Sequence, residues 1–230
     1  MKTGGATFRQ HVYANFAAGE VYPRPKVDNM ERAWLVDSLL RLPAERRAET
    51  RAYTGHFPFV VTELLGIDLV TFTILRHPVD RTLSYLKHCK RYHSQHAELS
   101  LEEIYEDPFY FPCFIHEHQT KIFSMTADDP LESYADVVDI DERRLEIAKT
   151  NLEKVDVVGL SEHHGEFVSE MQQRFGWQFK TLKNRRVSSE DWAAPASLRR
   201  RIADDNRADV AFFEFATQLH AQRRRTRSRR

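Results

Sequence analysis

Apolar residues follow two different spacings along this chain. Residues 69–75 and 155–160 are short, continuous apolar runs, which predict buried strands of a parallel sheet. Around them, apolar residues recur at helical spacing. Helices are predicted over residues 6–18, 29–40, 59–65, 78–92, 101–105, 115–123, 141–152, 161–175 and 195–221, with a short strand over 51–56. Helices that alternate with buried strands predict an α/β fold with a central, mostly parallel sheet flanked by helices.

A glycine pair opens the first predicted helix. Its segment consists of Lys2, Thr3, Gly4, Gly5, Ala6 and Thr7. Backbone N–H groups at such a helix start can bind a phosphate or a sulfate, and the ammonium group of Lys2 adds a positive charge. The segment does not have the spacing of a Walker loop, and no strand precedes it in this sequence. We therefore expect a P-loop-like layered sandwich with its first strand missing, and a flexible N-terminal turn is the alternative.

A second polar segment follows the predicted strand 69–75. Arg76 stands at the carboxyl end of this strand, where open α/β sheets bind their ligands. Ser84 lies about two turns along the next helix. An arginine can form a bidentate contact with a phosphate, and a serine hydroxyl can donate to the same group. The alternative interpretation is that Asp80 and Arg81 are solvated surface charges and that Ser84 is a packed small residue.

Charge is distributed unevenly along the chain. The formal net charge is zero, yet residues 222–230 contain six arginines and no acidic residue. The rest of the chain is therefore net acidic, which argues against nucleic acid as a partner. We expect one domain over residues 1–221 and a basic, disordered tail over 222–230. No apolar run is long enough for a membrane span and no secretory signal is visible, so a cytoplasmic protein with reduced Cys89 and Cys113 is expected.

Taken together, these segments resemble a known family. Lys-Thr-Gly-Gly-x-Thr at residues 2–7, followed by Arg-x-Pro-x-x-Arg-x-x-Ser at residues 76–84, is similar to the motifs of sulfotransferases that use 3′-phosphoadenosine 5′-phosphosulfate. The closest resemblance is to the branch of heparan sulfate and uronyl 2-O-sulfotransferases and their bacterial relatives. Residues 53–57, 157–162 and 205–216 also resemble segments of that branch. The order and the spacing of these short motifs carry the resemblance.

The resemblance implies an enzyme that moves a sulfuryl group from this donor to a hydroxyl acceptor, and it points to a carbohydrate as that acceptor. It implies that residues 2–7 bind the 5′-phosphosulfate and that Arg76 and Ser84 bind the 3′-phosphate. His56 would act as general base, and Lys2 would act on the bridging oxygen of the leaving group. Late basic residues of the family cover the nucleotide, and the resemblance implies this role for Arg185 and Arg186, with binding of an acidic acceptor or simple solvation as the alternatives.

This sequence departs from the family pattern at two places that bear on the site. Ala6 replaces a hydroxyl residue of the donor loop but keeps the backbone N–H. Residues 118–121, His-Gln-Thr-Lys, stand where relatives often have Asn-x-Gln-Thr-Arg, near the acceptor pocket. The identity of the acceptor is therefore less defined by the sequence than that of the donor.

Three other interpretations remain open at the level of sequence. A non-catalytic or truncated relative would keep nucleotide binding without turnover. A nucleotide-dependent phosphotransferase is disfavoured because the Walker spacing is absent. Cys89, His93 and His96 share one helical face and could bind zinc, but their spacing matches no common zinc pattern, so no metal is expected.

Overall fold

The chain is an α/β protein, rich in helices, with small parallel sheets. The computed structural model describes residues 5–30, 32–132, 135–179 and 193–227. The strands are β1 (Val21–Tyr22), β2 (Ala52–Tyr53), β3 (Phe72–Leu75) and β4 (Val157–Leu160). The helices are α1 (Gly5–Asn15), α2 (Val36–Leu40), α3 (Ala44–Glu49), α4 (Val61–Leu64), α5 (Pro78–Tyr92), α6 (Leu101–Tyr105), α7 (His118–Ser124), α8 (Glu142–Lys154), α9 (His164–Phe175), α10 (Ala196–Asp205) and α11 (Arg207–Arg227). Short single-turn segments are η1 (Ala18–Glu20), η2 (Ser94–His96), η3 (Phe111–Ile115) and η4 (Ser161–His163).

The two strongest predicted strands are confirmed and pair with each other. β3 and β4 run parallel, with Phe72 opposite Val157 and Leu75 opposite Leu160. β1 and β2 form a second parallel pair. Within the described residues the strands therefore form two small sheets, whereas the sequence predicted one central sheet.

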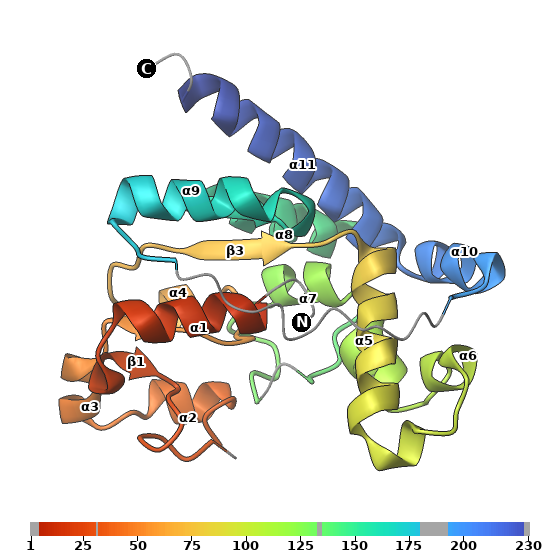
Figure 1. Ribbon diagram of the computed structural model, residues 1–230, viewed down its shortest axis with the longest axis horizontal. Coiled ribbons are helices and arrows are strands. Elements are labelled where there is room, and N and C mark those ends of the chain that lie inside the picture. Colours follow the sequence, from red (N-terminus) through yellow and green to blue (C-terminus); the bar gives the residue numbers. More distant parts are fainter. Residues whose placement is uncertain (1–4, 31, 133–134, 180–192, 228–230) are drawn as a thin grey trace.

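Helices cover both faces of the β3–β4 pair. Figure 1 shows two of them, α1 and α9, beside β3. On one face Ile74 and Val157 pack against apolar residues of α1 and α9. On the other face Leu75 and Val158 pack against α7, α8 and α11. The continuous apolar character of these strands follows from this burial on both faces.

The long helix predicted over residues 195–221 is divided at Asn206. The backbone of Asn206 leaves the helical region, and its side chain donates to the carbonyl of Ile202 at 2.8 Å. The same side chain accepts a hydrogen bond from the backbone N–H of Glu117 at 2.8 Å. Asn206 therefore ends α10, and α11 then continues through Arg227 into the arginine-rich segment. The guanidinium of Arg223 donates to the carbonyls of Val155 and Glu153, at the end of α8.

The N-termini of α7 and α11 cap each other. The carboxylate of Asp209, in the first turn of α11, accepts hydrogen bonds from the backbone N–H groups of Gln119 and Thr120 at 3.1 and 2.7 Å. The carboxylate of Glu117, directly before α7, accepts from the N–H groups of Ala208 and Asp209 at 2.9 and 2.6 Å. We call this arrangement the reciprocal cap. It satisfies backbone donors that helix starts leave without intrahelical partners, and it joins segments about ninety residues apart.

Burial changes the charge state within the reciprocal cap. Loss of solvation and the nearby charge of Asp209 raise the pKa of Glu117 to about 7, although the two N–H donors act in the opposite direction. Glu117 also adopts a left-handed backbone conformation with φ of 45°, which is uncommon for a residue other than glycine. The contacts of the reciprocal cap therefore hold the Glu117 carboxyl group in a poorly solvated site and its backbone in an uncommon conformation.

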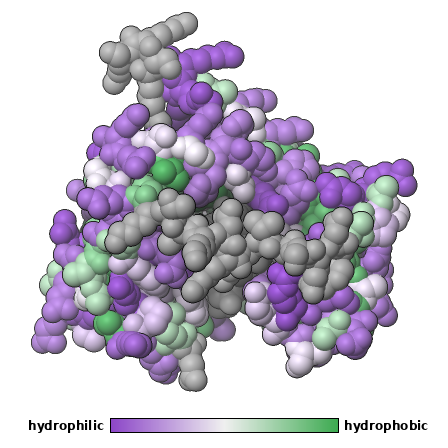
Figure 2. Space-filling view, viewed as in Figure 1, coloured by the Kyte–Doolittle hydropathy of each residue, from purple (hydrophilic) through white to green (hydrophobic). Residues whose placement is uncertain are grey.

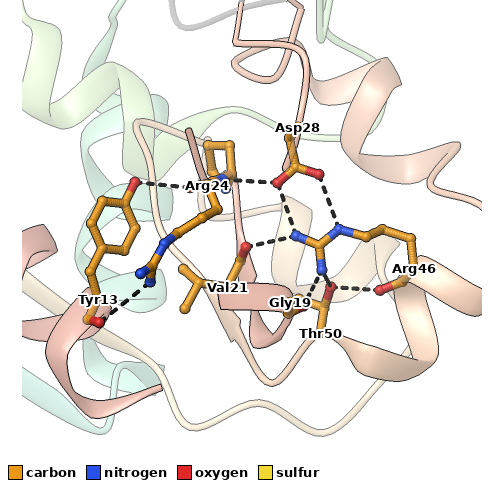
Figure 3. Close-up of polar contacts among 8 residues, drawn as sticks. Tyr13, Gly19, Val21, Arg24, Asp28, Arg46 and Thr50 are labelled. Carbon is orange, nitrogen blue, oxygen red and sulfur yellow. Dashed lines mark hydrogen bonds and ion pairs between the residues drawn. The ribbon is translucent and has the colours of Figure 1, made fainter. Parts of the chain in front are cut away.

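A buried ion pair organises the segment around β1 (Figure 3). The guanidinium of Arg46 donates to both carboxylate oxygens of Asp28 at 3.0 and 2.9 Å and to the carbonyl of Val21 at 2.7 Å. It also donates to the hydroxyl of Thr50 at 2.9 Å and to the carbonyl of Gly19. This bidentate geometry links α3 to the chain on both sides of β1.

The surface shown in Figure 2 is mostly polar, with small separate apolar areas. Across the described part of the chain, the structure has no helix that combines the length and the apolar character needed to cross a membrane.

Removal of the Asp209 carboxylate should destabilise the protein by about 3 kcal/mol, because buried N–H groups of α7 lose their acceptor. Urea denaturation of Asp209→Ala measures this change in the free energy of unfolding. Asp204→Ala, at an exposed position of α10, is the control and should change it by less than about 0.5 kcal/mol. Equal stability of the two variants would contradict the role of the reciprocal cap.

Candidate functional site

A cavity of about 610 Å³ lies between β2 with its following loop and β3. Residues of α1, α7 and α9 complete its lining, and most of the lining side chains are apolar. Its polar members include His56, His118 and Gln119. The cavity thus extends along β3 and the first helix and includes Leu75 at the carboxyl end of the strand, whereas Arg76 and Ser84 are not among its lining residues.

His56 follows β2 and faces the cavity. The turn before it requires glycine, because a Cβ atom on Gly55 would lie 2.6 Å from the ring of Phe57. The imidazole stacks on Trp34 with 6.4 Å between ring centroids, and the guanidinium of Arg9 lies 5.2 Å from the Trp34 ring. Burial, followed by the positive charges of Arg9 and Arg81, lowers the pKa of His56 well below its usual value. His56 is therefore neutral at pH 7, the form that can accept a proton.

His118, the first residue of α7, is a second imidazole in this cavity. Its side chain is 1% exposed, and neither ring nitrogen has a hydrogen-bond partner among the described residues. Burial, then the charges of Arg81 and Lys121, lowers the pKa of His118 well below its usual value, with a smaller effect of His56. A buried polar group without a partner costs about 1–3 kcal/mol. A polar group that is kept at such a cost inside a cavity indicates a ligand-binding role.

The sequence identified the segment of His118 as a departure from the family pattern but not His118 as a site residue. Its position depends on the reciprocal cap, which fixes the start of α7 through Glu117 and Asp209. The contact joins residues about ninety positions apart, so no local spacing in the sequence predicts it. The available signal was the histidine beside a glutamine and a threonine in the family-like segment.

Gln119 fixes the backbone of Arg76 at the end of β3. The amide oxygen of Gln119 accepts from the N–H of Arg76 at 3.1 Å, and its amide nitrogen donates to the carbonyl of Arg76 at 2.8 Å. The next residue, His77, donates its N–H to Glu162 at 3.3 Å. The predicted placement of Arg76 at the carboxyl end of the strand is therefore confirmed. Ser84 is half-buried on α5, which begins two residues after Arg76.

Arg81 is completely buried, contrary to the alternative that it is a solvated surface charge. Its guanidinium donates to the carbonyl of Phe114 and to the hydroxyl of Thr82. Burial lowers the pKa of Arg81 to about 10, and the carboxylate of Asp209 acts in the opposite direction. The side chain remains cationic at pH 7 and lowers the pKa of both cavity histidines. A fixed positive charge near a cavity favours an anionic ligand.

The predicted donor loop lies partly outside the described residues. Lys2, Thr3, Gly4, Arg185 and Arg186 are not among the residues that the structure describes. Gly5, Ala6 and Thr7 form the first turn of α1, so the predicted helix after the glycine pair is confirmed. The start of α1 therefore has the backbone N–H groups that an anion-binding helix terminus needs.

The chain was compared with known families and proteins. No protein-family model matches it, and no curated protein sequence matches it significantly. The function of the cavity must therefore be inferred from its own residues.

Substitution of the unpartnered His118 by an apolar residue should stabilise the protein. We expect His118→Leu to raise the free energy of unfolding by about 1–2 kcal/mol at pH 7.5. The gain should be about 1 kcal/mol larger at pH 5.5, because the unfolded state then binds a proton at His118 that the folded state, with its lowered pKa, does not. Denaturant titrations at the two pH values measure both effects.

His118→Gln is the matched control for this substitution. It keeps a polar group at the buried position and should bring no comparable gain. A loss of stability in His118→Leu that equals the loss in His118→Gln would show that the imidazole supports the fold rather than a ligand.

Proposed function

We propose that the chain is a sulfotransferase that uses 3′-phosphoadenosine 5′-phosphosulfate as donor and a hydroxyl group, on a carbohydrate, as acceptor. The observation that carries the proposal is the pair of neutral imidazoles, half-buried His56 and buried His118, in a cavity that extends along β3. The resemblance of residues 2–7 and 76–84 to the family motifs supports the same assignment.

The proposed architecture is a P-loop-like layered sandwich. The parallel β3–β4 pair with helices on both faces supports it, as does a helix that starts at Gly5, within the glycine pair. In this arrangement the start of α1 and the end of β3 both contribute to the donor site. Lys2 and the backbone N–H groups of residues 4–7 bind the 5′-phosphosulfate. Arg76 and Ser84 bind the 3′-phosphate, and Arg185 and Arg186 cover the nucleotide.

Sulfuryl transfer places particular demands on such a site. The sulfur moves in line between two oxygen atoms, so the protein must position both and stabilise spread negative charge, as in phosphoryl transfer. Lys2 stabilises the bridging oxygen that leaves with the nucleotide, and N–H groups at the start of α1 stabilise the transferred group. These protein groups supply the charge stabilisation in the proposed mechanism.

His56 removes the proton of the acceptor hydroxyl in this mechanism. Its lowered pKa keeps the imidazole neutral, which is the form that can accept a proton. A lowered pKa alone would make it a weak base, but the negative charge of a bound phosphosulfate raises the pKa of a neighbouring imidazole. Donor binding therefore activates the base. His118 supplies a second buried nitrogen that can hydrogen-bond the acceptor hydroxyl and orient it.

Calorimetric titration with adenosine 3′,5′-bisphosphate and with ATP tests the donor assignment. We expect the bisphosphate to bind at least about 50-fold more tightly, because Arg76 and Ser84 recognise a 3′-phosphate that ATP lacks. Arg76→Ala should weaken bisphosphate binding about 10- to 100-fold. Arg91→Ala, at an exposed position of α5, is the control and should bind as the unmodified protein does. Binding of ATP without binding of the bisphosphate would contradict the proposal.

The same variants separate an enzyme from a non-catalytic binding protein. His56→Ala should retain bisphosphate affinity and lose about 10²- to 10⁴-fold in transfer of ³⁵S-labelled sulfuryl groups to a panel of desulfated glycosaminoglycans and simple glycosides. Bisphosphate binding without transfer to any acceptor by the unmodified protein would favour the non-catalytic relative. Unchanged transfer by His56→Ala would remove His56 from the role of base.

A further inference from the structure

A cysteine and two histidines converge at the far end of α5. Cys89 lies in the last turn of α5, His93 directly follows the helix, and His96 lies in η2. One possible ligand atom from each residue lies within 4.8 Å of the other two. Cys89 and His96 are buried, and His93 is half-buried. The cluster is separate from the cavity, since Cys89 lies about 16 Å along the helix axis from Pro78.

His96 contributes a buried, unpartnered nitrogen to this cluster. Its side chain is 2% exposed, and its Nδ1 has no hydrogen-bond partner among the residues that the structure describes. Its other nitrogen, Nε2, lies 3.6 Å from the Asp107 carboxylate. Asp107 is itself held by the backbone N–H groups of Phe109 and Tyr110, both at 2.9 Å. A histidine held by a carboxylate at one nitrogen, with the other nitrogen open, is the usual arrangement of a metal-bound histidine.

The other two members also have outer partners. The Nδ1 of His93 lies 2.9 Å from the hydroxyl of Tyr110, which leaves Nε2 of His93 for a ligand. The hydroxyl of Tyr85 forms a hydrogen bond with the thiol of Cys89. Each possible ligand is therefore oriented by one side chain outside the cluster. Such supporting contacts fix the ligand geometry before an ion binds.

We propose that Cys89, His93 and His96 form a zinc-binding site. One thiolate and two imidazoles are ligands that Zn²⁺ prefers, and ligand atoms within 4.8 Å of one another need only a small approach to reach tetrahedral geometry. On binding, the thiol proton of Cys89 is released to solvent and a Zn–S bond forms. The three protein ligands leave one coordination position for water.

The ion has a structural role in this proposal. It joins the end of α5 to η2, and through Asp107 and Tyr110 it supports the chain between α6 and η3. Apolar residues of these elements, including Leu86, Ile104 and Phe114, form one core cluster. Zinc would therefore stabilise this part of the fold without contact with His56 or Arg76. The proposal does not depend on the proposed enzymatic function.

Metal binding by the full chain tests the site directly. After treatment with a chelator, titration with ZnCl₂ alone should show one equivalent bound with submicromolar affinity and should raise the midpoint of thermal unfolding. Substitution with Co²⁺ should give an intense near-ultraviolet thiolate-to-metal band and the visible absorption of a tetrahedral site. Cys89→Ser should weaken zinc binding at least 100-fold and abolish the thiolate band.

Cys113→Ser is the matched control, since Cys113 is the other buried cysteine of the chain and lies outside the cluster. It should bind zinc as tightly as the unmodified protein. If Cys89→Ser does not fold, His93→Gln is the variant to use, because His93 is only half-buried. It should lower the affinity for zinc at least 30-fold. Less than about 0.2 equivalents of zinc bound by the unmodified protein, or retention of the thiolate band in Cys89→Ser, would overturn the proposal.

Discussion

The reciprocal cap between α7 and α11 is the contact on which the candidate site depends. Two buried carboxylates, Glu117 and Asp209, each accept backbone hydrogen bonds from the other helix. Because the loss of either carboxylate leaves buried N–H groups without acceptors, the two helix starts are fixed relative to each other. That fixed position places His118 in the cavity and Gln119 against the backbone of Arg76. The end of β3 and the cavity are therefore joined through one helix terminus.

Local patterns in the sequence were sufficient for several elements. The strands β3 and β4, the helix that starts at the glycine pair, and the position of Arg76 all follow from short-range apolar spacing and turn residues. Three features could not be predicted in this way. The division of the last helix at Asn206, the reciprocal cap and the burial of Arg81 all depend on contacts between segments far apart in the chain. The same reason explains why the strands form two small sheets, because strand pairing is decided by tertiary contacts.

The electrostatics of the site combine buried cations with neutral histidines. Arg81 and Lys121 are both buried, and burial lowers the pKa of Lys121 to about 8. Loss of solvation is the main reason that His56 and His118 are neutral, and the charge of Arg81 adds to it at both, while that of Lys121 adds to it at His118. An anionic ligand would reverse much of this effect, since it compensates the cations and favours protonation of an imidazole. With the cavity empty, these buried polar groups make the folded protein less stable than an apolar lining of the same size would. This loss of stability is consistent with a site that is pre-organised for an anion.

We propose that an anionic nucleotide binds beside the two cavity histidines. Nuclear magnetic resonance of the protein with isotope-labelled histidine rings, recorded during titration with adenosine 3′,5′-bisphosphate, tests this claim most directly. We expect the ring signals of His56 and His118 to shift together and to saturate at one equivalent, whereas the signals of His163, which is half exposed beside Glu166, stay in place. Saturable binding that leaves the ring signals of both cavity histidines unchanged would contradict the account.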